Sequence, residues 1–153
     1  MRKYYEVMLE HFRELHAEAL KALDVLPAEA LDWVPGTEMN SISVLIMHFS
    51  GAERYWVGDV VNGDPSFRNR EAEFQVKGMD SAALKQRLAD LDAYEGKVFE
   101  TLRVRDLESW KVSPRDGSKL TVAWALLHAL QHTAVHLGHI EILTQQWKQK
   151  EAV

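Results

Sequence analysis

The last helical stretch of the sequence carries four histidines whose spacing places them on one side of a helix. His128, His132, His136 and His139 follow one another at steps of four, four and three residues. At about 100° per residue they lie within an arc of roughly 80°. The first half of this stretch is apolar almost all round, so we expect the imidazoles to point into the protein. Several buried imidazoles need partners for their ring nitrogens, and a shared divalent cation supplies one for each.

We interpret His132, His136 and His48 as the metal ligands. The i, i+4 spacing of His132 and His136 is the one used when two histidines of one helix bind one ion. His48 lies on an inward stripe of an earlier helix, with Val44 and Ala52. Alone it would more often be a core histidine satisfied by a hydrogen bond, but beside an inward-facing pair it becomes the third ligand. The chain has no cysteine, so the site must use nitrogen and oxygen, and three protein ligands plus water are typical of a reactive metal.

Three further residues are candidates for contacts around this site. A straight helix cannot readily bring three imidazoles from successive turns onto one ion, so we assign His128 to a supporting or core position. His139 can hydrogen-bond near the site or lie at a subunit contact. Asp59 shares the helical face of His48 and is a possible hydrogen-bond partner for a ligand.

Possible substrate-binding residues are fewer, and no general acid or base can be named. Arg68 and Arg70 lie in the polar segment 66–78 and could meet an anionic thiol, although a solvated loop is the more common arrangement. His11 and His16 are expected to be solvated or at the boundary of the core. His16 is the better pocket candidate of the two, because Phe12 and Leu20 are its neighbours on the helix.

Four amphipathic stretches must position these residues. Apolar residues at three- and four-residue steps predict helices over 3–26, from Asn40 or Ser41 to about 61, from Asp80 or Ser81 to about 104, and from Thr121 to about 147. The segment 27–39 forms a connector, and the Asn62-Gly63-Asp64-Pro65 run ends the second helix. The Asp116-Gly117 pair predicts a small hairpin or tight loop before the last helix.

Composition limits the remaining possibilities. The 153 residues, 46% hydrophobic and 27% charged, are typical of one globular domain, which we expect to span residues 1–153. Four helices with no other regular structure bury their apolar faces most simply as an all-α four-helix bundle. The net charge of −5 and the scattered basic residues argue against nucleic-acid binding. Without a signal core or a membrane-spanning stretch, we expect a soluble, cytoplasmic protein that does not insert into membranes.

Two motifs resemble those of the DinB-like superfamily, which contains damage-inducible proteins and thiol-dependent S-transferases. The first opens the second helix with Asn40-Ser41-Ile42-Ser43-Val44-Leu45-Ile46-Met47-His48 and continues downstream with Glu53-Arg54-Tyr55-Trp56. The second lies on the last helix, where His132 is followed after three residues by His136-Leu137-Gly138-His139-Ile140. The resemblance covers nearly the whole chain.

The resemblance implies an up-up-down-down bundle, often a homodimer, with a divalent metal bound by one histidine of the second helix and two residues of the fourth. These positions correspond to His48, His132 and His136. Some members have Glu at the position of His132. The histidine here adds a neutral ligand, and we expect zinc or nickel in place of a harder ion.

Two functions follow as hypotheses. The first is a metal-dependent enzyme that transfers a low-molecular-weight thiol onto a small electrophilic substrate, or rearranges or hydrolyses such an adduct, in stress or detoxification. The second is a non-catalytic stress-response protein whose metal is structural or senses a ligand. A bundle with buried histidines and no metal is the remaining alternative.

Overall fold

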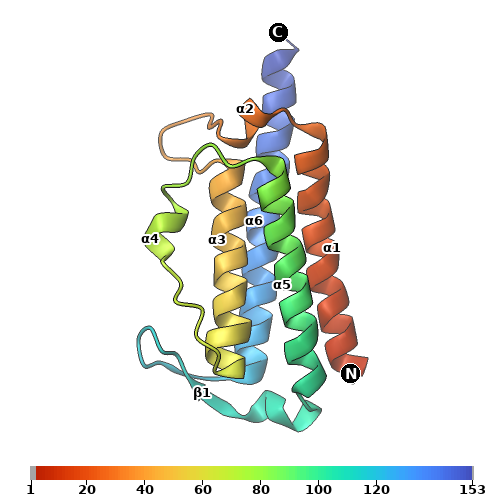
Figure 1. Cartoon of the computed structure of the whole chain (residues 1–153), viewed down its shortest axis with the longest axis vertical. Coiled ribbons are helices and arrows are strands. Elements are labelled where there is room, and N and C mark those ends of the chain that lie inside the picture. Colours follow the sequence, from red (N-terminus) through yellow and green to blue (C-terminus); the bar gives the residue numbers. More distant parts are fainter. Residues whose placement is uncertain (1–2, 153) are drawn as a thin grey trace.

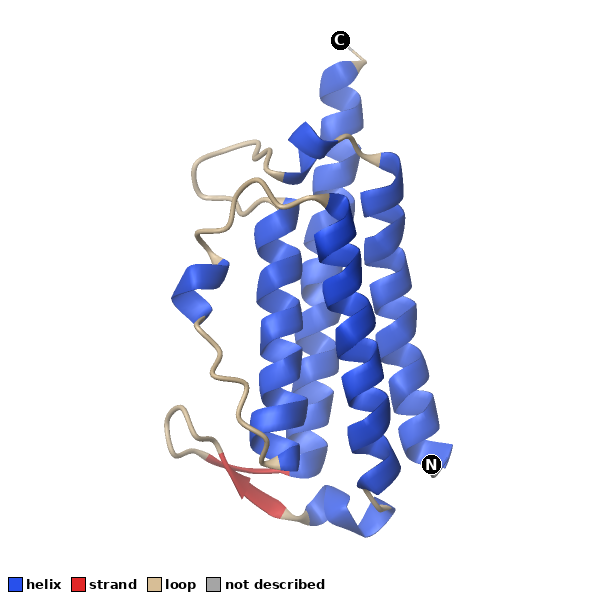
Figure 2. Cartoon of the chain, in the orientation of Figure 1, coloured by secondary structure: helices blue, strands red, loops and turns tan. Residues whose placement is uncertain are grey.

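The computed structural model describes residues 3–152, and four long helices that pack side by side make up most of it (Figures 1 and 2). They are α1 (Lys3–Val25), α3 (Ile42–Arg54), α5 (Ser81–Thr101) and α6 (Val122–Glu151). The short elements between them are α2 (Ala28–Leu31), η1 (Tyr55–Asn62), α4 (Arg70–Glu73), η2 (Val104–Glu108), β1 (Trp110–Val112) and β2 (Lys119–Thr121). The predicted four-helix bundle is confirmed.

The order of helix directions differs from the expected up-up-down-down arrangement. α1 runs up, α3 and α5 run down, and α6 runs up again (Figure 1). The reason lies in the connections. The α1–α3 segment stays at one end of the bundle, so α3 must return antiparallel to α1. The segment after η1 instead travels the length of the bundle and carries α4 along its side, so α5 starts at the same end as α3.

The helix boundaries follow the predicted caps. The side chains of Ser41, Asp80 and Thr121 each accept a hydrogen bond from a backbone N–H in the first turn of α3, α5 and α6. Gly63 ends the second helix in the left-handed conformation, with φ 73°. The last turns before it are π-helical (η1), which the apolar periodicity did not predict. Gly58 gives the Arg54 side chain room there, because a Cβ at this position would collide with it.

The predicted hairpin is also confirmed. β1 and β2 pair antiparallel, with Trp110 opposite Thr121 and Val112 opposite Lys119. The hairpin is tied to η1, because the Tyr55 hydroxyl lies 2.8 Å from Ser113 Oγ and accepts a hydrogen bond from the Arg115 N–H at 3.3 Å. It therefore covers the end of the bundle at which α6 begins (Figure 1).

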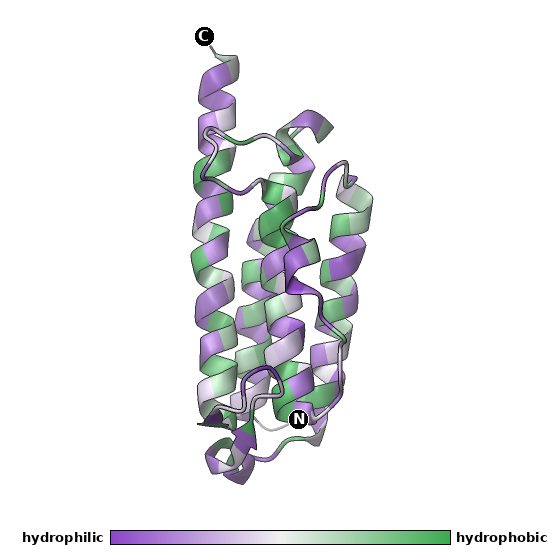
Figure 3. Ribbon diagram, turned by 90° about the vertical axis from the view of Figure 1, so that its left-hand side faces the viewer, coloured by the Kyte–Doolittle hydropathy of each residue, from purple (hydrophilic) through white to green (hydrophobic). Residues whose placement is uncertain are grey.

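Apolar and polar residues alternate along every long helix (Figure 3), as amphipathic helices with one buried face require. The buried apolar residues form two clusters, one toward the hairpin end and one toward α2. Buried polar side chains are also present in the interior, among them His16, Glu53, Glu95 and Thr133. None of the helices in residues 3–152 combines the length and apolarity needed to cross a membrane.

Candidate metal centre

Three histidines meet where the middle of α3 crosses the middle of α6. The ring centroid of His48 lies 5.0 Å from that of His132 and 5.0 Å from that of His136. The Nε2 atoms of His132 and His136 are 3.2 Å apart. Each of the three offers one ring nitrogen within 4.8 Å of the other two. Three neutral nitrogen donors at this separation fit a divalent transition-metal ion.

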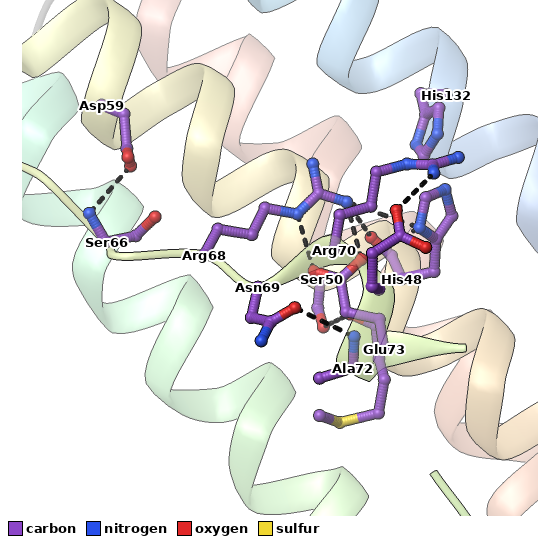
Figure 4. Close-up of polar contacts among 12 residues, drawn as sticks. His48, Ser50, Asp59, Ser66, Arg68, Asn69, Arg70, Ala72, Glu73 and His132 are labelled. Atoms are coloured by element: carbon purple, nitrogen blue, oxygen red, sulfur yellow. Dashed lines mark hydrogen bonds and ion pairs between the residues drawn. The ribbon is translucent and has the colours of Figure 1, made fainter. Parts of the chain in front are cut away.

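A carboxylate from α4 orients the first of these imidazoles. Nδ1 of His48 donates a hydrogen bond to Glu73 Oε2 at 3.0 Å, which leaves Nε2 with its lone pair free for a metal. Arg68 in turn holds Glu73, donating from Nε to Oε1 at 2.6 Å and from Nη2 to Oε2 at 2.7 Å (Figure 4). Burial raises the pKa of Glu73, but the hydrogen bonds from Arg68 and His48 outweigh it, so the pKa lies below its ordinary value.

Glu73 was not among the residues singled out from the sequence. It lies in a polar segment, and nothing in the local pattern distinguishes it from Glu71. One signal points to it indirectly: Gly51 stands on α3, one turn after His48. A Cβ at Gly51 would collide with Glu73 Oε1 and approach Arg68 Nε. The glycine therefore permits the close approach of α4 that brings Glu73 to His48.

His132 and His136, the other two histidines of the cluster, are neutral at physiological pH. The neutral imidazole is the form that binds metals. Burial, followed by the neighbouring histidines, lowers the pKa of His132 to about 3. The same causes lower the pKa of His136 to about 4. Their Nδ1 atoms are buried and have no hydrogen-bond partner in the described structure. Of the three histidines, His48 is the one whose ring is hydrogen-bonded to a carboxylate in this part of the chain.

A cavity of about 310 Å³ opens beside His48 and His132. His128 lines it too, with its ring stacked on Trp124 at 4.7 Å and its centroid 6.1 Å from that of His132. Burial and the charge of Arg115 lower the pKa of His128. The structure thus places His128 next to the cluster, where it forms part of an aromatic wall.

His139 and Asp59, the other two residues considered as supporting partners, do not line this cavity. His139 is exposed and has its ring 5.6 Å from that of His136, where it lines a separate cavity of about 240 Å³ with Leu45 and Leu143. Asp59 Oδ1 accepts hydrogen bonds from Ser66 N at 3.1 Å and from Arg54 Nη1 at 3.3 Å. Its carboxylate therefore orders the start of the segment that leads to α4, away from His48 (Figure 4).

His16 is buried, with 1% of its surface exposed, which corrects the expectation of a solvated or boundary position. Both of its ring nitrogens face carboxylates: Nδ1 lies 2.7 Å from Asp92 Oδ1 and Nε2 lies 2.9 Å from Glu53 Oε1. Burial lowers the pKa of His16, but the two carboxylates outweigh it and raise the pKa to about 9. Burial and the neighbouring Glu53 raise the pKa of Glu95 well above its ordinary value. The helical periodicity could place His16 on α1 but not identify these partners.

The two arginines of the α4 segment differ in their surroundings. Arg68 is held by Glu73, as described above, whereas Arg70 is half exposed and lies 4.9 Å from the Phe74 ring. Both line the cavity beside the histidines. No general acid or base was predicted. Among the described residues that line the cavity, His128 is the one imidazole that is not a candidate metal ligand.

Comparison with known structures places this architecture among DinB-like proteins. A DinB-like protein from Bacillus cereus shares 15% identity at a TM-score of 0.75, covering 94% of this chain and 92% of that one. YfiT from Bacillus subtilis, described as a probable metal-dependent hydrolase with an unusual four-helix bundle topology, shares 16% identity at a TM-score of 0.74, covering 97% and 90%. A mycothiol-dependent maleylpyruvate isomerase (H52A mutant) shares 11% identity at a TM-score of 0.65, covering 87% of this chain and 59% of that one. A comparison with curated proteins gave no match.

The fold is therefore that of DinB-like four-helix-bundle proteins, and His48, His132 and His136 form a group that could hold a metal ion. The chain belongs to the family described as "Protein of unknown function (DUF1572)", whose model matches residues 1–152.

Proposed function

We propose that the protein is a metal-dependent enzyme whose divalent ion is bound by His48, His132 and His136. The observation that carries this proposal is the convergence of three imidazole nitrogens from two helices within 4.8 Å of one another. Neutral nitrogen ligands suit zinc or nickel better than a hard ion such as magnesium. When bound, such an ion supplies Lewis acidity, which lowers the pKa of a coordinated water or thiol and polarises a carbonyl.

The side chains around the ligands have distinct roles in this proposal. Glu73 fixes the tautomer and the ring orientation of His48, and Arg68 fixes Glu73. The cavity of about 310 Å³ gives a small molecule access to His48 and His132. Arg70, which lacks a close buried partner, is available to an anionic group of that molecule.

Two reactions suit this site: hydrolysis, and transfer of a low-molecular-weight thiol to an electrophile. The probable hydrolase YfiT supports the first and the mycothiol-dependent isomerase supports the second, since both share the fold. A non-catalytic ligand-sensing role in a stress response is the alternative if the metal binds but neither reaction occurs.

Elemental analysis of untagged protein purified without chelator tests the metal site. We expect close to one equivalent of zinc or nickel in the wild type and in His11→Ala, because His11 is an exposed histidine of α1 that pairs with Glu14. We expect loss of the metal in His48→Ala, His132→Ala and His136→Ala, with helical circular dichroism retained. Absence of metal in the wild type, together with failure to take up zinc or nickel on titration, would refute the proposal.

The metal-loaded protein should then be assayed with activated esters and amides and, separately, with thiols plus electrophiles. Metal-dependent turnover that His132→Ala abolishes would support the enzyme. Turnover in neither assay, with stoichiometric metal present, would favour the sensing role.

We further propose that the protein forms a cytoplasmic homodimer. α6 exposes apolar side chains at seven- and eight-residue intervals, namely Leu127, Val135 and Ile142. Light scattering during size-exclusion chromatography tests this directly, and a monomeric mass at micromolar concentration would rule it out.

A further inference from the structure

The cavity beside the histidines has an unbalanced charge. Arg68, Arg70 and Arg115 all line it, and no carboxylate does so among the described residues. Arg68 is neutralised by Glu73. The other two pair only with their exposed sequence neighbours, Arg70 with Glu71 at 3.5 Å and Arg115 with Asp116 at 2.9 Å. Exposed pairs of this kind are weak, so both guanidinium groups remain available to a ligand.

One wall of the same cavity is aromatic. The rings of Trp124 and His128 are stacked nearly parallel, at 4.7 Å and 8°, and Trp56 meets His128 edge-on at 4.9 Å. Trp124 is 48% exposed, which is unusual for a tryptophan in a packed helix. A flat apolar group would bury this surface while its polar end stays among the arginines.

The hairpin fixes the position of Arg115 relative to this wall. The Arg115 N–H is hydrogen-bonded to the Tyr55 hydroxyl, and its guanidinium carbon lies 6.0 Å from the Trp56 ring. The arginine thus belongs to a surface that is already ordered, which reduces the entropy lost when a ligand binds.

We propose that this cavity binds a small organic anion, a carboxylate or a phosphate ester, that carries a flat apolar group. Arg70 and Arg115 pair with the anionic group, and the flat group lies against Trp124 and His128. A volume of about 310 Å³ is at the lower end of the range for ligand sites, so the molecule is small. That this anion is the substrate rests on the proposed metal-dependent function, whereas its binding does not.

Isothermal titration of metal-free protein, prepared with a chelator, tests the proposal independently of the metal. The probes are benzoate and phenyl phosphate, with benzamide as the uncharged match for benzoate and acetate as the carboxylate without a ring. We expect benzoate or phenyl phosphate to bind and benzamide and acetate to bind at least ten-fold more weakly. Whichever anion binds more tightly identifies the anionic group that the site prefers.

Variants assign the binding to this cavity. Arg70→Gln and Arg115→Gln should each lower the affinity for the tighter-binding anion about ten-fold, which is the loss expected for one charge-assisted hydrogen bond. Trp124→Leu should also lower the affinity for that anion, while the weak binding of acetate stays unchanged. Arg105→Gln is the matched control, because Arg105 is an exposed arginine of η2 that does not line the cavity.

The proposal is overturned if neither anion binds at millimolar concentration, if benzamide binds as tightly as benzoate, or if Arg105→Gln weakens binding as much as the cavity variants. A protein that fails to take up metal but binds the anion in the expected pattern would overturn the proposed metal function alone.

Discussion

The ion pairs of His16 should make the stability of the bundle depend on pH in a predictable direction. The imidazole lies between Asp92 and Glu53 in the interior, and its pKa rises from 6.5 to about 9. Each pKa unit corresponds to about 1.36 kcal/mol, so the protonated histidine contributes about 3 kcal/mol to the free energy of unfolding. Because the pKa is higher in the folded state, this contribution is present in full below about pH 6.5. It is lost as the pH rises through about 9.

Urea unfolding in the presence of a chelator, at a series of pH values from about 6 to 10, measures this effect. His16→Gln removes the titrating group, and the difference in free energy of unfolding between the wild type and this variant should shrink by about 3 kcal/mol across the interval. The control is His11→Gln, which changes an exposed histidine paired with Glu14 and should follow the wild type at every pH. If the difference between the wild type and His16→Gln stays constant from pH 6 to 10, the assignment of a charged His16 is wrong.

Three further predictions concern the proposed metal centre. Glu73→Gln keeps the shape of the side chain but removes the charge that orients His48. We expect zinc affinity, measured by competition with a chromogenic chelator, to fall 10- to 100-fold. Unchanged affinity would show that Glu73 does not support His48 in binding the metal. Gly51→Ala should push Glu73 and Arg68 away from His48 and lower zinc affinity by at least ten-fold, whereas Gly96→Ala, whose Cβ meets only ordinary contacts, should leave it unchanged. Removing zinc with a chelator should lower the midpoint of thermal unfolding of the wild type, because a bound ligand at 100 times its dissociation constant stabilises the folded state by about 2.7 kcal/mol. In the matching control, His132→Ala should unfold at the same midpoint with and without zinc.

The helix caps, the hairpin turn and the histidine pair could be predicted because each depends on residues that are close together in the sequence. Ser41, Asp80 and Thr121 cap their helices as expected, and Asp116-Gly117 lies in the predicted hairpin. Histidine spacing on one helix is also a local property, so the convergence of His132 and His136 could be predicted. His48 required only the further assumption that an inward face of α3 packs against α6.

The features that escaped prediction depend on contacts between distant segments. The direction of α3 is set by where the α1–α3 connection runs, which periodicity does not encode. Glu73 reaches His48 because α4 packs on α3 at Gly51, 22 residues earlier in the chain. The burial of His16 likewise depends on α5, which brings Asp92 to it across the bundle.

Four of the buried polar residues fix the alignment of the four helices relative to one another. They come from every helix of the bundle: His16 from α1, Glu53 from α3, Glu95 from α5 and Thr133 from α6. Thr133 donates a hydrogen bond to Glu53 Oε2 at 2.6 Å, and His16 faces the other oxygen of that carboxylate. Apolar side chains above and below would tolerate a helix that slid by one turn, because one aliphatic contact replaces another. The same slip would leave a buried carboxylate without its hydrogen-bond partner, which would destabilise the fold by several kcal/mol. The interior thus selects a single register, and with it the one alignment of α3 and α6 that brings His48 to His132 and His136.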